Sequence, residues 1–287
     1  MTTERKIALQ EAAISCGSPT RGTELAYDAL VARGLSGEVL VPMEKISPCE
    51  SWPEGLRHLD TVMEVCRRLR ENTLTALEAG RVPVTLGGDH SITMGTLAAL
   101  GEHYGPDRVA VVYIDGHTDI NTEKTSATGC IHGMDLAAAC GLCCEELTVG
   151  RQKVNVLGEN IHIIGARSID PPEYGIMEEL GVNLYPTEEV LREGVPRLLD
   201  RLLPRLEGKR VHISFDVDSM DPSEFSATGY LLPGGLTMGQ AEELMTAVLA
   251  TGQVCSFECV EYNPLSDPNG EDGDRLAAML GRLMKML

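Results

Sequence analysis

The apolar run VAVVYI at 109–114 is followed at once by DGHTD at 115–119. A short apolar run without polar alternation is typical of a strand buried on both faces, as in parallel sheets. The next five residues bring two carboxylates and an imidazole to the carboxyl end of that strand. Together the two segments predict a parallel α/β sheet with metal-ligating side chains at the end of one strand.

Apolar runs and helical patterns alternate on both sides of this segment. The other predicted strands are 82–86, 161–165, 211–215 and 256–262; the predicted helices are 56–78, 92–100, 134–140, 188–206 and 238–251, the last two with Thr187 and Thr237 as N-caps. Such alternation predicts βαβ units with helices on both faces of the sheet. The Pro- and Gly-rich pieces, such as 47–55, are too short to be linkers. We expect a single three-layer α/β/α domain over 1–287 with a mostly parallel central sheet.

Two more polar clusters follow predicted strands in the same way. GGDHS at 87–91 follows the run 82–86, and DVD at 216–218 follows the run 211–215. In open parallel sheets, ligands bind outside the carboxyl ends of the strands. We therefore expect the three clusters to meet at one site. Asp216 and Asp218 are two residues apart, which places both on the same side of an extended backbone.

Each cluster also has a simpler interpretation. Gly-Gly-Asp-His and Asp-x-Asp are common in turns and caps, whereas Asp-x-His-x-Asp offers three ligands on one short segment and is harder to explain as solvated surface. Four carboxylates crowded at a buried sheet end would repel one another and be driven to protonate. Two divalent cations would balance their charge. Oxygen donors with two imidazoles favour Mn, Fe or another octahedral metal over a structural zinc.

The composition excludes several classes of protein. The chain has 24 basic and 43 acidic residues and a formal net charge of −19, which argues against a nucleic-acid binder or a polybasic membrane-surface protein. Its apolar runs are too short to span a bilayer, and its charged N-terminus leads into no signal core. Nine cysteines at irregular spacing are typical of reduced thiols in the cytoplasm, with Cys140, Cys143 and Cys144 interpreted as helix-end packing.

At these residues the sequence resembles the ureohydrolase family of arginases, agmatinases and their relatives. The matching segments are GGDHS at 87–91, DGHTD at 115–119, SFDVDSMDP at 214–222, ATGYLLPGGLT at 227–237 and VEYNP at 260–264. DINTEKTSATGCIHGMDLA at 119–137 and IHIIGARSIDPPE at 161–173 are similar to bacterial arginases in particular. The resemblance is weaker at 22–26. It implies an arginase-like fold and the hydrolysis of a guanidino compound to urea and an amine.

The resemblance also implies a set of functional residues. Two Mn²⁺ ions per chain are expected, with Fe, Co and Ni as alternatives; His90, Asp115, Asp119 and Asp216 would hold one ion, and Asp115, His117, Asp216 and Asp218 the other. Glu261 matches the Glu that binds the guanidinium group, for which a carboxylate is suited by paired charge-assisted hydrogen bonds. His132 matches the His that passes a proton to the leaving amine. Asp119 would also accept a hydrogen bond from the hydroxide that bridges the two ions.

The substrate residues implied by the resemblance are Asn121, Thr128, Cys130 and Asp170. Thr128 keeps the hydroxyl of the usual Ser, but Cys130 replaces the usual Asn, and a thiol is a weaker donor than an amide. We expect L-arginine as the substrate, with agmatine, 4-guanidinobutanoate or another guanidino compound as the alternative. A non-catalytic metal-binding subunit is a third interpretation. By analogy, the partners are a small guanidino substrate and further copies of the chain in a cytoplasmic trimer or hexamer.

Overall fold

The fold is described from a computed structural model, for residues 6–43 and 55–287. In this part of the chain, seven parallel strands form one sheet in the order β1-β2-β7-β6-β3-β4-β5. The strands are β1 (Ile7–Glu11), β2 (Val82–Leu86), β3 (Val109–Ile114), β4 (Ile161–Ile164), β5 (Asn183–Tyr185), β6 (Arg210–Asp216) and β7 (Val254–Val260). The central strands are buried along almost their whole length, as their apolar runs predict.

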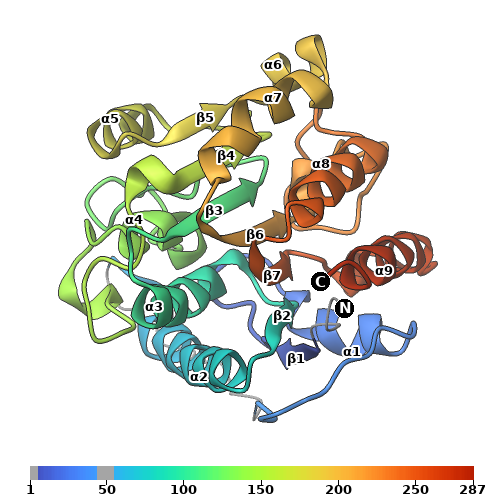
Figure 1. Cartoon of the computed structure of the whole chain (residues 1–287), viewed down its shortest axis with the longest axis horizontal. Helices are drawn as coiled ribbons and strands as arrows, with labels where there is room; N and C mark the ends of the chain where they lie inside the picture. Colours follow the sequence, from blue (N-terminus) through green and yellow to red (C-terminus); the bar gives the residue numbers. More distant parts are fainter. Residues whose placement is uncertain (1–5, 44–54) are drawn as a thin grey trace.

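Helices cover both faces of the sheet. They are α1 (Ala26–Val31), α2 (Leu59–Glu78), α3 (Thr93–Tyr104), α4 (Asp135–Ala139), α5 (Pro171–Leu180), α6 (Thr187–Glu193), α7 (Val195–Leu206), α8 (Met238–Ala250) and α9 (Glu271–Met284). One hydrophobic core joins the sheet to α1, α6, α7, α8 and α9, and a second joins it to α2, α3, α4 and α5. Figure 1 shows these two groups on opposite sides of the twisted sheet. The predicted three-layer α/β/α arrangement is confirmed.

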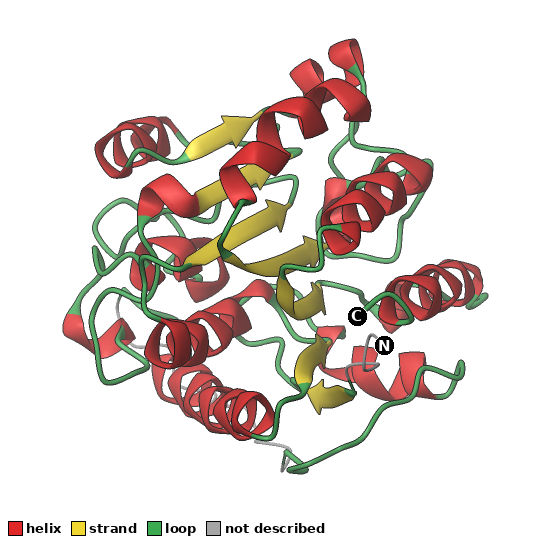
Figure 2. Ribbon diagram, viewed as in Figure 1, coloured by secondary structure: helices red, strands yellow, loops and turns green. Residues whose placement is uncertain are grey.

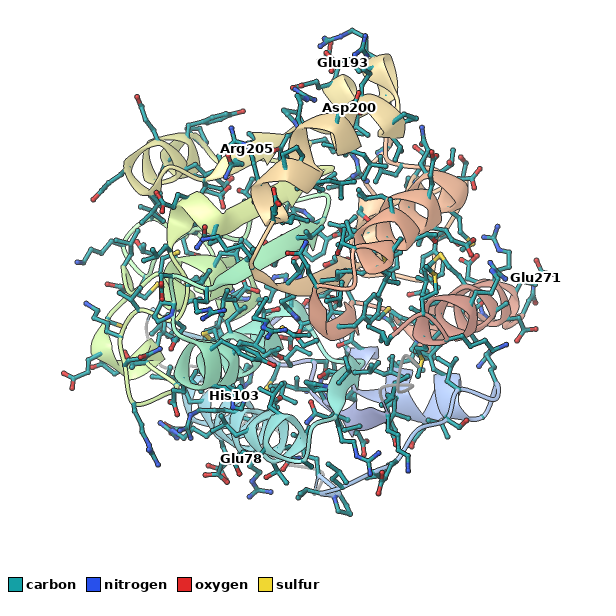
Figure 3. The ribbon with its side chains drawn as sticks, viewed as in Figure 1. Glu78, His103, Glu193, Asp200, Arg205 and Glu271 are labelled. Carbon is teal, nitrogen blue, oxygen red and sulfur yellow. The ribbon has the colours of Figure 1, made fainter. Side chains whose placement is uncertain are left out.

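The layers also separate polar from apolar side chains. The strands run through the centre of the molecule and the helices and loops surround them (Figure 2). The charged side chains labelled in Figure 3, such as Glu78 and Glu271, lie at the periphery.

Within the described residues, no helix combines the length and apolar character needed to cross a bilayer. Most of the segment 47–55 and the first five residues lie outside the described part of the chain.

Two local predictions about the helices have different outcomes. Thr237 caps α8 as predicted: its side chain accepts from the Gln240 N–H, and the Gln240 side chain completes a capping box. The prediction of Thr187 as an N-cap is wrong, because Thr187 is already helical and its hydroxyl donates to the Gly165 carbonyl. The predicted helix 188–206 is interrupted at Gly194, which has a φ of 82° and separates α6 from α7.

Candidate metal centre and substrate cavity

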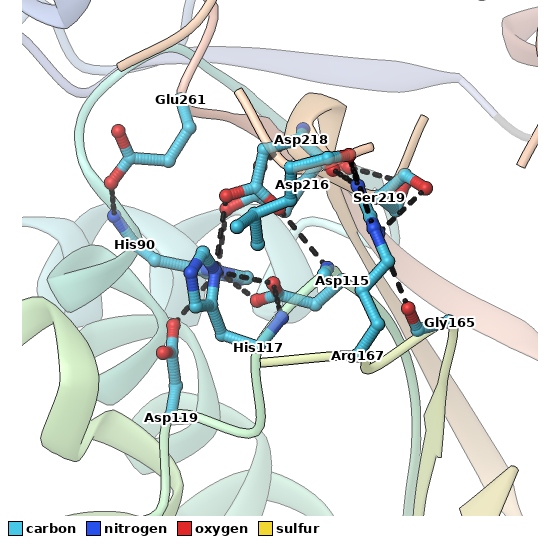
Figure 4. Close-up of polar contacts among 12 residues, drawn as sticks. His90, Asp115, His117, Asp119, Gly165, Arg167, Asp216, Asp218, Ser219 and Glu261 are labelled. Carbon is cyan, nitrogen blue, oxygen red and sulfur yellow. Dashed lines mark hydrogen bonds and ion pairs between the residues drawn. The ribbon is translucent and has the colours of Figure 1, made fainter. Parts of the chain in front are cut away.

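The candidate site lies at the carboxyl ends of four strands that are neighbours in the sheet: β2, β7, β6 and β3. His90 follows β2, Glu261 follows β7, Asp216 ends β6, and Asp115 follows β3. The predicted convergence of the polar clusters is confirmed by this arrangement (Figure 4). Gly88 makes the turn after β2 possible: its φ is 89°, and a Cβ there would lie 2.8 Å from the Ala12 carbonyl oxygen.

The imidazole of His90 is surrounded by carboxylates. Its Nδ1 lies 2.9 Å from Asp115 Oδ2, 3.2 Å from Asp216 Oδ2 and 3.4 Å from Asp119 Oδ2. On the other side, His117 Nδ1 lies 3.5 Å from Asp115 Oδ1. Asp115 therefore faces one imidazole with each of its oxygens, which is the arrangement that a bridging carboxylate requires.

His117 belongs to a second group of donors. Its Nδ1 lies 3.1 Å from Asp218 Oδ2, and the other oxygen of Asp218 accepts from the Gly116 N–H. Our reason for placing Asp216 and Asp218 together is wrong, because residues 217–219 form a 3₁₀ turn rather than extended backbone. The turn still brings the two together, since the Asp218 N–H donates to Asp216 Oδ1 at 2.7 Å.

The charges of the centre are strongly coupled. Burial raises the pKa of Asp216 well above its usual value, and repulsion from Asp218 and Asp115 raises it further. Burial lowers the pKa of His90, but hydrogen bonds to Asp115, Asp119 and Asp216 outweigh this and raise it well above its usual value. The neighbouring carboxylates contribute to the upward shift of both pKa values, so the centre holds an excess of buried negative charge.

This donor set fits divalent cations. Two of its three-residue groups, His90 with Asp115 and Asp216, and His117 with Asp115 and Asp218, each have ligand atoms within 4.8 Å of one another. Asp115 Oδ2 is fully buried and faces His90 Nδ1 at 2.9 Å, but it accepts no hydrogen bond when that nitrogen presents its lone pair. Buried polar atoms are rarely left without a partner. Mostly oxygen donors with two imidazoles match a pair of octahedral cations.

A buried hydrogen-bond chain sets which ring nitrogen of His90 faces the centre. Ser214 Oγ lies 2.7 Å from His90 Nε2 and donates to Glu258 at 2.8 Å. Glu258 also accepts from Thr93 and faces His212 Nε2 at 3.2 Å. The Ser214 hydroxyl has one proton and donates it to Glu258, so its oxygen accepts a hydrogen bond from His90 Nε2–H. The lone pair of Nδ1 is thereby free for a metal.

Two of the predicted functional residues have unusual backbone conformations. Asp119 and Glu261 have positive φ angles of 44° and 60°, which non-glycine residues rarely adopt. Glu261 Oε1 accepts from the His90 N–H at 3.0 Å and lies 3.2 Å from His132 Nδ1. Glu261 Oε2 is buried and has no partner among the described residues. Strained backbone is often retained where it aims a functional group.

The predicted substrate residues line a cavity of about 280 Å³ beside the metal centre. Asn121 Nδ2 donates to Asp170 Oδ2 at 3.0 Å, and Thr128 Oγ1 accepts from the Cys130 N–H at 3.2 Å. Cys130 is only 4% exposed, so its thiol is part of the wall rather than of the rim. The wall also includes His117, Asp119 and His132, which join the cavity to the metal centre.

Two residues at or beside the site, Tyr230 and Arg167, were missed by the sequence analysis. Tyr230 lines the cavity, with its ring 5.8 Å from that of His132 and 5.3 Å from that of His117. Arg167 donates to the carbonyls of Asp218, Ser219, Met220 and Leu232, and so holds the loop after β6 (Figure 4). Both residues lie within segments that match the family, but neither has a local spacing pattern that separates it from ordinary loop residues.

Known proteins match the chain over nearly its whole length. The family model described as "Arginase family" matches residues 8–286, which includes the divergent segment 22–26. The arginase of Bacillus caldovelox is 36% identical over 237 residues, 82% of this chain and 79% of the relative. The solved arginase of Bacillus subtilis has a TM-score of 0.90 at 30% identity, covering 98% of both chains. An Entamoeba histolytica arginase solved in complex with L-ornithine has a TM-score of 0.89 at 27% identity, covering 99% of both.

Proposed function

The chain belongs to the arginase family, and on this premise we propose that it hydrolyses L-arginine to L-ornithine and urea with two Mn²⁺ ions. The observation that carries the proposal is the junction of a buried donor set for two cations with a cavity lined by Asn121 and Asp170. Residues 1–287 would act as one domain. We place the enzyme in the cytoplasm as a homo-oligomer, a trimer or hexamer by analogy.

The spacing of the donors and the family resemblance together support a role for each donor. His90, Asp115, Asp119 and Asp216 would hold one ion, and Asp115, His117, Asp216 and Asp218 the other. Asp115 faces His90 with one oxygen and His117 with the other, which supports its role as a bridge. Asp216 Oδ2 lies beside His90, so its bridging role rests on the family resemblance. When bound, a pair of divalent cations supplies a water molecule that loses its proton readily near neutral pH.

Glu261 and His132 would act on the substrate itself. The unpartnered Oε2 of Glu261 is suited to accept from a guanidinium N–H and to orient the planar group. His132 Nδ1 lies within hydrogen-bond distance of Glu261, which leaves Nε2 to pass a proton to the leaving amine. Burial lowers the pKa of His132, but the hydrogen bond to Glu261 and its charge outweigh this and raise it, which favours the protonated form needed in a general acid.

The far end of the cavity would bind the α-amino and α-carboxylate groups of arginine. Asn121, Thr128 and Asp170 supply polar atoms there, while Cys130 contributes only a thiol. A hydrogen bond to a charged group contributes about 1.5–3 kcal/mol of binding free energy. Because Cys130 has a thiol in place of an amide, we expect it to bind the substrate carboxylate more weakly. This substitution also supports the second candidate function, hydrolysis of agmatine, 4-guanidinobutanoate or another guanidino compound.

A substrate panel tests the proposal. Urea release by the Mn²⁺-loaded protein is measured with L-arginine, agmatine and 4-guanidinobutanoate. We expect hydrolysis of arginine with a raised KM, since an interaction lost equally from ground state and transition state raises KM alone. Turnover of agmatine or 4-guanidinobutanoate without turnover of arginine would establish the second function instead. Two bound ions without urea release from any guanidine would indicate a non-catalytic metal-binding subunit.

A further inference from the structure

Two buried polar residues beside the metal centre have no role in the mechanism above. Tyr113 lies in β3, and Asp135 is the first residue of α4; both are fully buried. The phenol oxygen of Tyr113 lies 3.0 Å from His90 Nδ1 and 3.0 Å from Asp119 Oδ2. It also lies 3.2 Å and 3.1 Å from the two oxygens of Asp135. A tyrosine inside an apolar strand thus points its hydroxyl at predicted metal ligands.

The oxygens around His90 have the spacing of ligands on one ion. Four of them surround Nδ1: Asp115 Oδ2 at 2.9 Å, Tyr113 Oη at 3.0 Å, Asp216 Oδ2 at 3.2 Å and Asp119 Oδ2 at 3.4 Å. In an octahedral site with metal–ligand distances of about 2.1 Å, each ligand has four neighbours about 3 Å away. The phenol oxygen therefore lies within the same range of distances from Nδ1 as the three carboxylates, and 3.0 Å from one of them, Asp119 Oδ2, as a neighbouring ligand would.

The stacking of the two rings decides where the phenol proton goes. The rings of Tyr113 and His90 are 4.4 Å apart and inclined by only 5°. Because the two rings are stacked rather than coplanar, the phenol oxygen lies out of the imidazole plane and off the axis of the Nδ1 lone pair. The proton is instead donated to a carboxylate.

Of the two carboxylates within hydrogen-bond distance of the phenol, Asp119 and Asp135, Asp135 has fewer other polar neighbours. Asp119 Oδ2 already faces His90 Nδ1, whereas the hydrogen bonds that Asp135 accepts from the described residues come from the Tyr113 hydroxyl and the Leu136 N–H. Asp135 also forms a potential metal-binding group with His90 and Asp119, with ligand atoms within 4.8 Å of one another. A hydroxyl that donates to Asp135 keeps its lone pairs directed towards the centre. A neutral hydroxyl oxygen is a hard donor of the kind that Mn²⁺ accepts.

We propose that Tyr113 supplies an additional oxygen ligand to the cation held by His90, and that Asp135 orients this ligand by accepting its proton in a hydrogen bond. The proposal rests on the binuclear centre of the proposed function and not on the substrate. It assigns a ligand to one ion only, because the phenol oxygen lies beside His90 and its hydrogen bonds to described residues include no donor of the His117 group.

The test compares metal release by Tyr113→Phe, Asp135→Asn, the double variant and the control Tyr185→Phe. Tyr185 is also a buried tyrosine at a strand end, but it packs against Arg201 and His162. The Mn²⁺-loaded proteins are dialysed against graded chelator and their metal content is measured. Co²⁺-loaded samples give visible absorption spectra, which report the number of ligands. Circular dichroism melting checks the fold of each metal-loaded variant.

We expect Tyr113→Phe to release one of its two ions at an about 10-fold lower chelator concentration, with the other ion unaffected and the Co²⁺ spectrum altered. Asp135→Asn should act in the same direction but less, and the double variant should equal Tyr113→Phe. Wild-type release and an unaltered spectrum in Tyr113→Phe would overturn the proposal, as would equal loss of both ions with a lowered melting temperature. A wild type that binds two ions but hydrolyses no guanidine contradicts the proposed function alone.

Discussion

The metal centre and the substrate cavity lie against each other but are built in different ways. The metal donors follow buried strands, and Asp115 and Asp216 are 0% and 2% exposed. One wall of the cavity is formed by the loop 121–130, whose polar groups bond to one another and to Asp170. A buried donor has a fixed position and a fixed charge to balance, whereas a loop accommodates substitutions such as Cys130. Substrate choice can therefore change in this molecule without a change in the hydrolytic centre.

The first prediction removes a metal-ligating carboxylate from the metal centre. Asp216→Ala should lose most hydrolytic activity and lower the metal content, because Asp216 is proposed to contact both ions. Metal analysis and urea release on the same sample measure the effect. Asp221→Asn, in the same segment but with its carboxylate bonded to Ser223 and Gly234, is the control. Near-normal turnover in Asp216→Ala would refute the binuclear centre.

The second prediction concerns His132, where the two regions meet. His132→Asn should lower kcat by about 10²–10⁴-fold, the range expected when a general acid is lost. Metal content should be unchanged, since His132 is not proposed as a ligand. His103→Asn, at an exposed position on α3, controls for a general effect of the substitution. Loss of metal with little change in kcat would mean that His132 is a metal ligand of the metal centre instead.

The third prediction restores a hydrogen-bond donor to the loop 121–130 of the substrate cavity. Cys130→Asn should lower KM for L-arginine by about 10-fold, equivalent to about 1.4 kcal/mol, and leave kcat and metal content unchanged. Agmatine, which has no carboxylate, is the matched control substrate and should respond little. An unchanged KM for arginine would show that the side chain at 130 does not reach the substrate.

The last prediction concerns folding stability rather than activity, and it separates acid unfolding from events at the metal centre. Burial, with the charges of Arg205 and Lys209, lowers the pKa of His162 to about 4. Between pH about 6.5 and 4 the unfolded chain binds a proton that the folded chain does not, so His162 lowers stability progressively as the pH falls through that window. The loss amounts to about 3 kcal/mol below it.

Denaturant unfolding at pH 7.5 and pH 4.5 measures this contribution. His162→Gln should lose less stability than wild type between these two values, because it carries no titrating ring. Arg205→Gln, which removes one of the two cations, should show an intermediate loss. An equal loss in wild type and His162→Gln would place the acid sensitivity elsewhere, for example in the donors of the metal centre.

The limits of prediction are visible in single residues. The prediction of Thr237 as a cap is confirmed, and its partner Gln240 is only three residues away. The prediction of Thr187 is wrong, because its hydroxyl donates to the Gly165 carbonyl, which is distant in sequence. Tyr113 and Asp135 could not be found from the sequence at all. A tyrosine within an apolar run predicts core, and an aspartate at the start of a helix predicts favourable dipole interaction. Their pairing arises from tertiary packing.

The sequence by itself determined which segments form buried strands and that His90, Asp115, His117 and Asp216 lie at or near their carboxyl ends, because apolar runs and strand-end residues are local properties of the chain. Only the tertiary structure decided the strand order β2-β7-β6-β3. That order brings the His90 N–H to within 3.0 Å of Glu261, 171 residues away in sequence. Long-range order depends on how helices pack on both faces of the sheet, and packing is a property of the whole chain.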